Sequence, residues 1–356
     1  QLVLHTFAVV TSLGALDGNR IMGNGDVYMP ITPMFHVHAW GMPFAATLLG
    51  LKQVYPGRYD PELLVDLWQK EKVTFSHCVP TILQMVLNAK AAQGVDFNGW
   101  KLIIGGSALN RSLFLNAKER GMHLSTAYGM SETGPIISGA YLNDQSLAGS
   151  EDQRTSSLLK AGVPVPLVQA RILDAEGKSL PHDGHAQGEL VLRAPWLTMA
   201  YFNEPQKSAE LWEGGWLHTG DVAAIGTDGA IEIRDRIKDV IKTGGEWISS
   251  LELEDLISRN SAVREVAVVG MPDERWGEAP FALVVLRDGH SLDAAGLQAH
   301  MLPFVEQGRI NKWGIPRQIA VVSEIPKTSV GKLDKKVIRL HVTKWQAEGN
   351  PVISSL

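Results

Sequence analysis

The sequence predicts an α/β protein in which part of a large domain is joined by a hinge to a smaller α+β domain. Three observations indicate this fold class. Strand and helix patterns alternate between residues 60 and 134, short strands with tight turns fill residues 168–233, and helices and strands alternate again after residue 250. The first pattern is typical of a parallel-rich sheet covered by helices, and the second of a small β-rich subdomain.

The N-terminal part begins with apolar residues at helical spacing. We expect a helix whose buried face is formed by Leu2, Val3, Phe7, Val10 and Leu13. Asp60 and Pro61 are a good N-cap and first helical residue, so a second helix should begin there. The pattern then predicts a strand at 73–79, a helix at 80–92, a strand at 102–104 and a helix at 111–120.

Two polar, glycine-rich loops follow strands of this predicted sheet. The first is Gly105, Gly106, Ser107 and Ala108, and the second is the run Y-G-M-S-E-T-G at residues 128–134. Ligands of such sheets usually bind beyond the carboxyl ends of the strands. An aromatic ring, two hydroxyls and a carboxylate between glycines suit a purine, phosphate oxygens and a cation. Alternatively, both loops are only tight turns.

Residues 33–38, with the sequence P-M-F-H-V-H, follow another strand-like run. Their aromatic and imidazole groups could line a pocket, or the histidines could be ordinary core residues.

The β-rich subdomain at 168–233 has hairpin turns at residues 174–177 and 228–229. Beyond it, the stretch R-D-R-I-K-D-V-I-K-T-G-G-E at residues 234–246 places charges around an apolar pair and ends in two glycines. We interpret it as the hinge and place the domain boundary between residues 237 and 238. Alternatively, it is a basic strand edge followed by a turn. Helices at 251–258 and 297–304 and strands at 265–269 and 281–286 then predict the α+β domain, residues 238–356.

Composition excludes several classes of function. The chain has 356 residues, 45% hydrophobic and 20% charged, with a net charge of −5, so nothing marks it for nucleic acid or an anionic membrane. Its single cysteine, Cys78, excludes an internal disulfide and fits a reducing compartment, so we expect a cytoplasmic protein. The most apolar segment, residues 37–51, is too short to span a bilayer.

In this order and at these distances, the motifs resemble those of the adenylate-forming (AMP-binding) superfamily of acyl-CoA synthetases, peptide-synthetase adenylation domains and luciferases. The resemblance covers essentially the whole chain. Besides the loops and the hinge, it rests on Gly188-Glu189-Leu190, Thr219-Gly220-Asp221 and the lysine of the loop P-K-T-S-V-G-K-L-D at residues 326–334.

The resemblance implies a role for each matching position. Adenine would be held by Tyr128 and by the loop Gly105, Gly106, Ser107 and Ala108, with Gly129 beside them. Mg²⁺ would be held by Glu132, and a phosphate oxygen by Thr133. The ribose hydroxyls would be bound by Asp221, assisted by Arg236. The binding site of the acid substrate would be lined by His36, Val79 and Met130. Lys332 would contact the α-phosphate and the carboxylate, Lys238 would be the hinge, and Gly245 would line the pantetheine channel.

The activity implied is ATP-dependent conversion of a carboxylic acid to acyl-AMP, followed by transfer to CoA. His36, the segment 79–81 and the run ending at Trp247 look most like those of ligases for medium- or long-chain fatty acids or similar aliphatic acids. The cofactors would be ATP, Mg²⁺ and coenzyme A, and a homodimer is possible. The alternatives are an adenylation domain for an amino or aryl acid and a non-catalytic nucleotide-binding chain.

The sequence departs from the family at its start. The glycine- and hydroxyl-rich phosphate loop, which in the family ends in a lysine and lies upstream of the first residues seen here, has no counterpart in the sequence. We therefore expect a polypeptide that lacks the N-terminal region and is impaired in adenylation.

Overall fold

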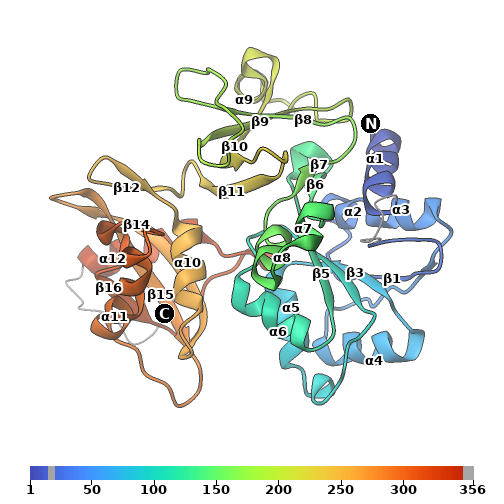
Figure 1. Ribbon diagram of the computed structural model, residues 1–356, viewed down its shortest axis with the longest axis horizontal. Helices are drawn as coiled ribbons and strands as arrows, with labels where there is room; N and C mark the ends of the chain where they lie inside the picture. Colours follow the sequence, from blue (N-terminus) through green and yellow to red (C-terminus); the bar gives the residue numbers. More distant parts are fainter. Residues whose placement is uncertain (15–20, 348–356) are drawn as a thin grey trace. The chain divides into compact units, whose positions relative to one another are not determined.

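The computed structural model describes residues 1–14 and 21–347 and divides the chain into two compact units, Gln1–Ile233 and Arg234–Leu356 (Figure 1). Residues 234–237 thus lie with the second unit, just before the boundary expected from the sequence. The role of residues 238–356 as a mobile domain stays a prediction. No helix of the described residues is long and apolar enough to cross a membrane.

The first unit is built on a seven-stranded sheet of order β2-β1-β3-β4-β5-β6-β7. The strands from β2 to β5 are parallel, whereas β6 and β7 are antiparallel. Their bounds are β1 Val27–Pro30, β2 Lys52–Gln53, β3 Phe75–Cys78, β4 Lys101–Ile104, β5 His123–Gly129, β6 Ile136–Gly139 and β7 Val163–Pro164. The predicted parallel-rich sheet is therefore confirmed.

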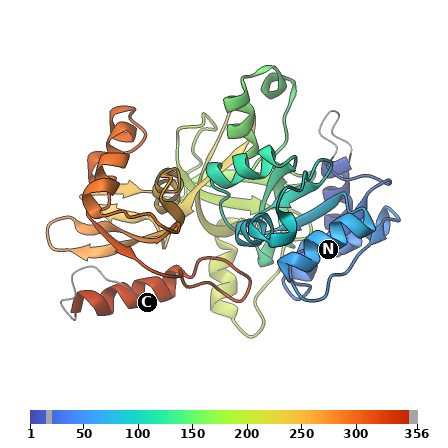
Figure 2. The ribbon, with the colours of Figure 1, turned by 90° about the horizontal axis from the view of Figure 1, so that it is seen from below.

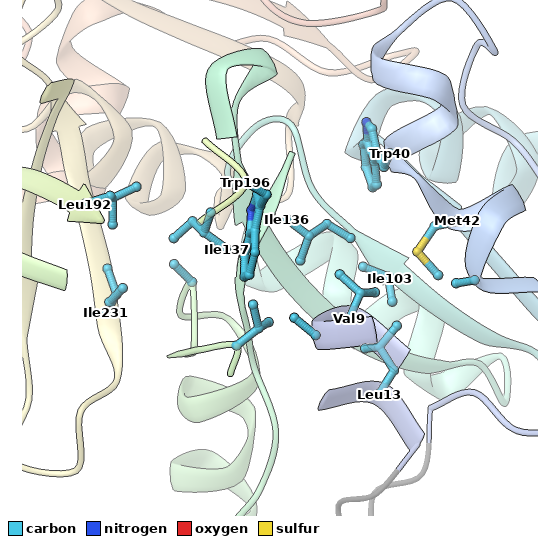
Figure 3. Close-up of a cluster of buried hydrophobic side chains, with 14 of the residues drawn as sticks. Val9, Leu13, Trp40, Met42, Ile103, Ile136, Ile137, Leu192, Trp196 and Ile231 are labelled. Atoms are coloured by element: carbon cyan, nitrogen blue, oxygen red, sulfur yellow. The ribbon is translucent and has the colours of Figure 1, made fainter. Parts of the chain in front are cut away.

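Side chains of this sheet alternate between two cores. Leu102 and Ile104 of β4 pack in one core and Ile103 in the other, as the two-residue period of a strand requires. The first core is covered by helices α4 (Pro61–Glu71), α5 (Pro80–Asn88) and α6 (Arg111–Glu119). The second core is covered by α1 (Leu2–Gly14), α3 (Met42–Leu48) and the β-rich subdomain. In Figure 3, Trp196 lies between the subdomain's Leu192 and Ile231 and the α1 side chains.

Two local expectations need correction. Leu2, Val3 and Phe7 of α1 are exposed, and the buried face consists of His5, Thr6, Ala8, Val9 and Leu13. The helix carries apolar residues around most of its circumference, so spacing alone did not identify the packed side. The helix expected at 80–92 ends at Asn88, because Ala89 is extended, and a 3₁₀ turn, η1 (Lys90–Ala92), follows. Asp60 caps α4 as predicted, accepting the N–H groups of Glu62 and Leu63.

The β-rich subdomain is a four-stranded antiparallel sheet of order β11-β10-β9-β8. Its elements are β8 Gln169–Leu173, β9 Gly188–Arg193, α9 Pro205–Leu211, η3 Glu213–Gly215, β10 Leu217–Ile225 and β11 Ile231–Arg236. The predicted turns at 174–177 and 228–229 are present, closed by the N–H groups of Gly177 and Gly229. Helices α7 (Asp144–Ala148) and α8 (Glu151–Leu158) lie in the chain between β6 and β7 of the first sheet. Two further short elements of the unit are α2 (Val37–Trp40) and η2 (Ser131–Thr133).

The second unit is an α+β sandwich around a five-stranded sheet. Its strands are β12 Ile241–Thr243, β13 Glu246–Ile248, β14 Val263–Asp273, β15 Gly277–Leu286 and β16 Gln318–Val321, with the turn η4 Lys312–Gly314. Helices α10 (Ser250–Ser258) and α11 (Ala294–Glu306) cover one face. Helix α12 (Lys335–Ala347) covers the other, as Figure 2 shows.

Candidate nucleotide site

Four of the predicted site positions follow neighbouring parallel strands. His36 lies beyond β1, Val79 directly after β3, Gly105 directly after β4 and Tyr128 at the end of β5. Strands β1, β3, β4 and β5 are adjacent and parallel. The structure therefore brings these positions to one edge of the sheet, where ligands of such sheets usually bind.

The loop after β4 packs closely on its neighbours. The Gly105 N–H donates to the Cys78 carbonyl at 3.2 Å. A Cβ on Gly105 would lie 2.8 Å from the carbonyl oxygen of Ala127 and 3.2 Å from the ring of Trp40, so a side chain would have to displace backbone. Gly106, Ser107 and Ala108 are exposed beyond it, at the carboxyl end of the strand.

The loop at residues 128–134 is held by its own hydrogen bonds. A Cβ on Gly129 would lie 1.8 Å from the Pro135 carbonyl oxygen, so only glycine fits there. Thr133 is fully buried, and its hydroxyl accepts the Met130 N–H at 2.9 Å. The same hydroxyl also donates to the carbonyl of Pro135. A bond from Thr133 to a phosphate oxygen would require these bonds to be exchanged.

The predicted adenine and ribose positions lie in direct contact. The Tyr128 hydroxyl donates to Asp221 Oδ2 at 2.5 Å. Asp221 is only 4% exposed, so its carboxylate is withdrawn from bulk water. A carboxylate has about four acceptor positions, so this bond leaves capacity for hydroxyl donors of a ligand.

Asp221 lies in an irregular part of β10 that is held by Glu189. The pairing of β10 with β9 shifts register between His218 and Val222. Across this bulge Glu189 accepts the Gly220 N–H on Oε1 at 3.1 Å and bonds His218 Nδ1 through Oε2 at 2.9 Å. Gly220 has φ +67°, a left-handed conformation that favours glycine. In the sequence Glu189 was only part of a motif, and its action on the bulge could be found only from the structure.

Glu132 bonds a tyrosine that sequence reasoning missed. The Tyr201 hydroxyl donates to Glu132 Oε1 at 2.7 Å. Burial, together with this bond, raises the pKa of Tyr201 to about 12, so the phenol stays protonated and remains a donor. Within the described ranges 1–14 and 21–347, no three His, Cys, Asp or Glu side chains converge as a metal site. A single carboxylate nevertheless suits Mg²⁺, which is commonly bound by one or two carboxylates together with substrate phosphates.

Two buried rings, those of Trp196 and His5, pack against the loop at residues 128–134. Trp196 Nε1 donates to the Thr133 carbonyl at 3.0 Å, and the His5 ring packs edge-on against Trp196 at 5.7 Å. Burial lowers the pKa of His5 to about 4, against a hydrogen bond to the Ile136 carbonyl that acts the other way. The imidazole is therefore neutral near pH 7. The sequence carried no signal for either contact.

The segment after His36 has an unusual backbone. Val37, His38, Ala39 and Trp40 have φ between 48° and 59°, followed by Gly41 at 73°. Left-handed backbone costs roughly 1–2 kcal/mol for each L-residue, so tertiary packing must hold this turn. The Trp40 ring, tilted against His77 at 5.0 Å, is one such anchor. The expected loop at 33–38 thus leads into a constrained turn.

The remaining predicted residues belong to the second unit. Arg236 and Lys238 are exposed at the start of this unit. Gly245 has φ +86° in the turn between β12 and β13, and a Cβ there would meet no atom within 4 Å. Lys332 is partly buried in the loop before α12. These four roles stay predictions.

Two family models match the sequence. The model described as AMP-binding enzyme matches residues 2–202, and the model described as AMP-binding enzyme C-terminal domain matches residues 252–332. The chain belongs to the AMP-binding enzyme family. The resemblance inferred from the motifs is therefore confirmed.

Curated relatives of this AMP-binding enzyme include acid–CoA ligases. A long-chain-fatty-acid–CoA ligase of Thermus thermophilus is 39% identical over 341 residues, which cover 95% of this chain and 61% of the relative. A 3-methylmercaptopropionyl-CoA ligase of Ruegeria pomeroyi is 37% identical over 343 residues, covering 94% and 62%. The chain thus spans about three-fifths of the length of these relatives.

Solved structures support the fold of the AMP-binding enzyme family. An amide bond synthetase from Marinactinospora thermotolerans matches with a TM-score of 0.79 at 27% identity, over 96% of this chain and 65% of that one. An anthranilate CoA ligase in complex with anthranoyl-AMP matches with a TM-score of 0.81 at 23% identity, over 97% and 64%. The latter shows similarity of fold alone.

Proposed function

We propose that this protein activates a carboxylic acid with ATP and transfers the acyl group to coenzyme A. The observation that carries the proposal is the contact between Tyr128 and Asp221, the residues expected to hold the adenine and the ribose. This contact lies in the first unit, where the Gly105 loop and Tyr128 follow the neighbouring parallel strands β4 and β5. Membership of the AMP-binding enzyme family and the similarity to acid–CoA ligases support the same reaction.

In the first half-reaction a carboxylate oxygen of the acid attacks the α-phosphorus of ATP, and pyrophosphate leaves. A carboxylate is a poor electrophile, and this step turns it into an acyl-adenylate. Asp221 would accept the ribose hydroxyls with help from Arg236, and Tyr128 would stack on the adenine. Lys332 would stabilise the charge that develops on the α-phosphate. Mg²⁺ held by Glu132 would neutralise phosphate charge.

In the second half-reaction the sulfur of coenzyme A attacks the acyl carbon, and AMP leaves. Gly245 would border the path of the pantetheine, since a residue without a side chain leaves room beside its backbone. Lys238 would be the hinge at which the second unit turns between the two half-reactions.

For the acid we propose a medium- or long-chain fatty acid or a similar small aliphatic acid. The names of the Thermus and Ruegeria relatives support an aliphatic acid. His36, Val79 and Met130 would line its site. An aryl acid, as in the name of the anthranilate ligase, is the competing class.

The test is carboxylate-dependent exchange of pyrophosphate into ATP with a panel of acids. It should be run on this chain and on the chain extended at its N-terminus with the phosphate-loop region of the family. We expect the extended protein to exchange pyrophosphate with aliphatic acids. Exchange only with aryl or amino acids would contradict the acid class, and no exchange with any acid would contradict the activity.

A further inference from the structure

Arg339 of α12 binds the segment that contains the predicted hinge, and Lys335 of the same helix is linked to that segment through Ser250. We define this hinge segment as residues 234–239. Arg339 Nη1 donates to Asp239 Oδ1 at 2.8 Å. Lys335 lies one turn earlier, and residues four apart share a helix face. It is coupled to Asp235, at the other end of the hinge segment.

Lys335 is linked to Asp235 through a buried hydrogen-bond network. Lys335 Nζ donates to Ser250 Oγ at 2.6 Å and lies 2.8 Å from Glu254 Oε1. The Ser250 hydroxyl in turn donates to Asp235 Oδ2 at 2.7 Å, and the Ser250 N–H donates to the same oxygen at 2.5 Å. Asp235 is 1% exposed and Lys335 is 9% exposed. Ser250 is therefore the bridge between the helix and the hinge segment.

The charges of this network depend on one another. Burial raises the pKa of both Asp235 and Glu254, and the Lys335 ammonium opposes the shift in each case. One cation thus stabilises two buried carboxylates. Removing one partner of a buried ion pair leaves the other charge uncompensated.

The loop that carries Lys332 is fixed to the start of the same helix. The Thr328 N–H donates to the Lys332 carbonyl at 2.8 Å, and the Asp334 N–H donates to the Pro326 carbonyl at 2.9 Å. Asp334 then accepts the Val337 N–H at 3.2 Å within the first turn of α12. A shift of the start of α12 would therefore move Lys332.

We infer that Lys335 and Ser250 form a latch that joins the hinge segment to the Lys332 loop, so that Lys335 is a positioning residue for Lys332. This inference rests on the proposed roles of Lys332 and Lys238. If the chain turns at Lys238, Asp235 lies before the pivot, whereas Ser250, Lys335 and Asp239 lie after it. The turn then opens the latch and leaves the Arg339–Asp239 pair closed. The closed latch therefore opposes a turn at Lys238.

The first test measures the latch without reference to catalysis. Hydrogen exchange is followed in this chain and in the variants Ser250→Ala, Lys335→Met and Lys335→Arg, with the exposed Lys336→Met as matched control. Ser250→Ala removes only a hydroxyl, so this variant still tests the latch if Lys335→Met fails to fold. We expect faster exchange of the amides of Arg236 and Ser250, both bonded to Asp235. If these amides exchange as slowly in the variants as in the parent, the latch does not exist.

The second test compares the two half-reactions in the extended protein. Acyl-adenylate formation without CoA and CoA-dependent consumption of supplied acyl-adenylate are timed separately. Ser250→Ala and Lys335→Met should change the ratio of the two rates by at least about fivefold, the lower end of usual coupling between linked states. Lys335→Arg should restore much of the parent ratio, and Lys336→Met should leave it unchanged.

The outcomes separate the two proposals. If the parent carries out neither half-reaction, the proposed function fails, and the exchange experiment still decides whether the latch exists. If the parent is active and the variants lower both rates equally, Lys335 is only structural and the positioning role is wrong.

Discussion

The Tyr128 hydroxyl donates to the Asp221 carboxylate at 2.5 Å, although 93 residues separate them in the sequence. Tyr128 comes from the parallel-rich sheet and Asp221 from the antiparallel subdomain. Their contact joins the ligand-binding edge of one sheet to the other sheet. Contacts that set the position of either residue should therefore alter nucleotide binding.

Glu189→Ala should weaken AMP binding by about three- to thirtyfold. Alanine removes the carboxylate that accepts the Gly220 N–H and bonds His218 across the bulge that holds Asp221. Calorimetric titration measures the affinity, and thermal unfolding shows whether the variant is folded. The exposed Glu210→Ala in the same subdomain is the matched control. Parent affinity in a folded Glu189→Ala would show that the bulge does not position Asp221.

Lys332→Ala in the extended protein should abolish acyl-adenylate formation and spare thioester formation from supplied acyl-adenylate. The ammonium is needed where charge develops on the α-phosphate and not in the attack of the thiol. Rapid-quench assays of each half-reaction distinguish the two steps, and Lys336→Ala is the control. Equal loss of both steps would contradict this role, and so would no loss in either.

Much of the fold could be predicted because it depends on local patterns. The helix cap at Asp60 and the alternation of strands and helices follow from residue type and spacing. The packed face of α1 could not be predicted, because the exposed Leu2, Val3 and Phe7 are apolar whereas the buried face includes the polar residues His5 and Thr6. The left-handed turn at Val37–Trp40 carries no glycine, so no local signal marks it.

The site was predictable only as a set of motifs. The resemblance identified Tyr128 and Asp221 separately. Their contact could not be predicted, because it depends on how the two sheets pack against each other. The supporting side chains Glu189, Tyr201 and Trp196 act through bonds to distant backbone or carboxylates. Such bonds depend on tertiary structure and leave no periodic pattern.

Acid should destabilise the first unit through His77. Burial lowers the pKa of His77 to about 3, while the unfolded chain has the ordinary value near 6.5. Between these values the unfolded state binds the proton more readily, so the free energy of unfolding falls as the pH falls below about 6.5. The neutral His77 makes its full contribution to the free energy of unfolding above that pH, and this contribution is lost progressively toward pH 3. It amounts to a few kcal/mol, since each pKa unit is worth about 1.4 kcal/mol.

Urea unfolding of the parent and of His77→Gln at pH 7.5 and pH 5 measures this effect. Glutamine can still bond the Tyr28 hydroxyl, which lies 2.7 Å from His77 Nε2. The variant should lose less stability than the parent on acidification, whereas the exposed His123→Gln should behave as the parent. An equal acid response in His77→Gln and the parent would exclude His77 as the cause.

The most direct test of the nucleotide site is calorimetric titration of AMP into this chain, into Asp221→Ala and into Asp66→Ala. Asp66 is an exposed carboxylate of α4 and serves as the control. We expect the parent and Asp66→Ala to bind AMP equally. Asp221→Ala should bind about a hundredfold more weakly or worse, because two charge-assisted bonds of about 1.5–3 kcal/mol each are lost. No binding by the parent, or equal affinity in Asp221→Ala, would contradict the nucleotide site proposed here.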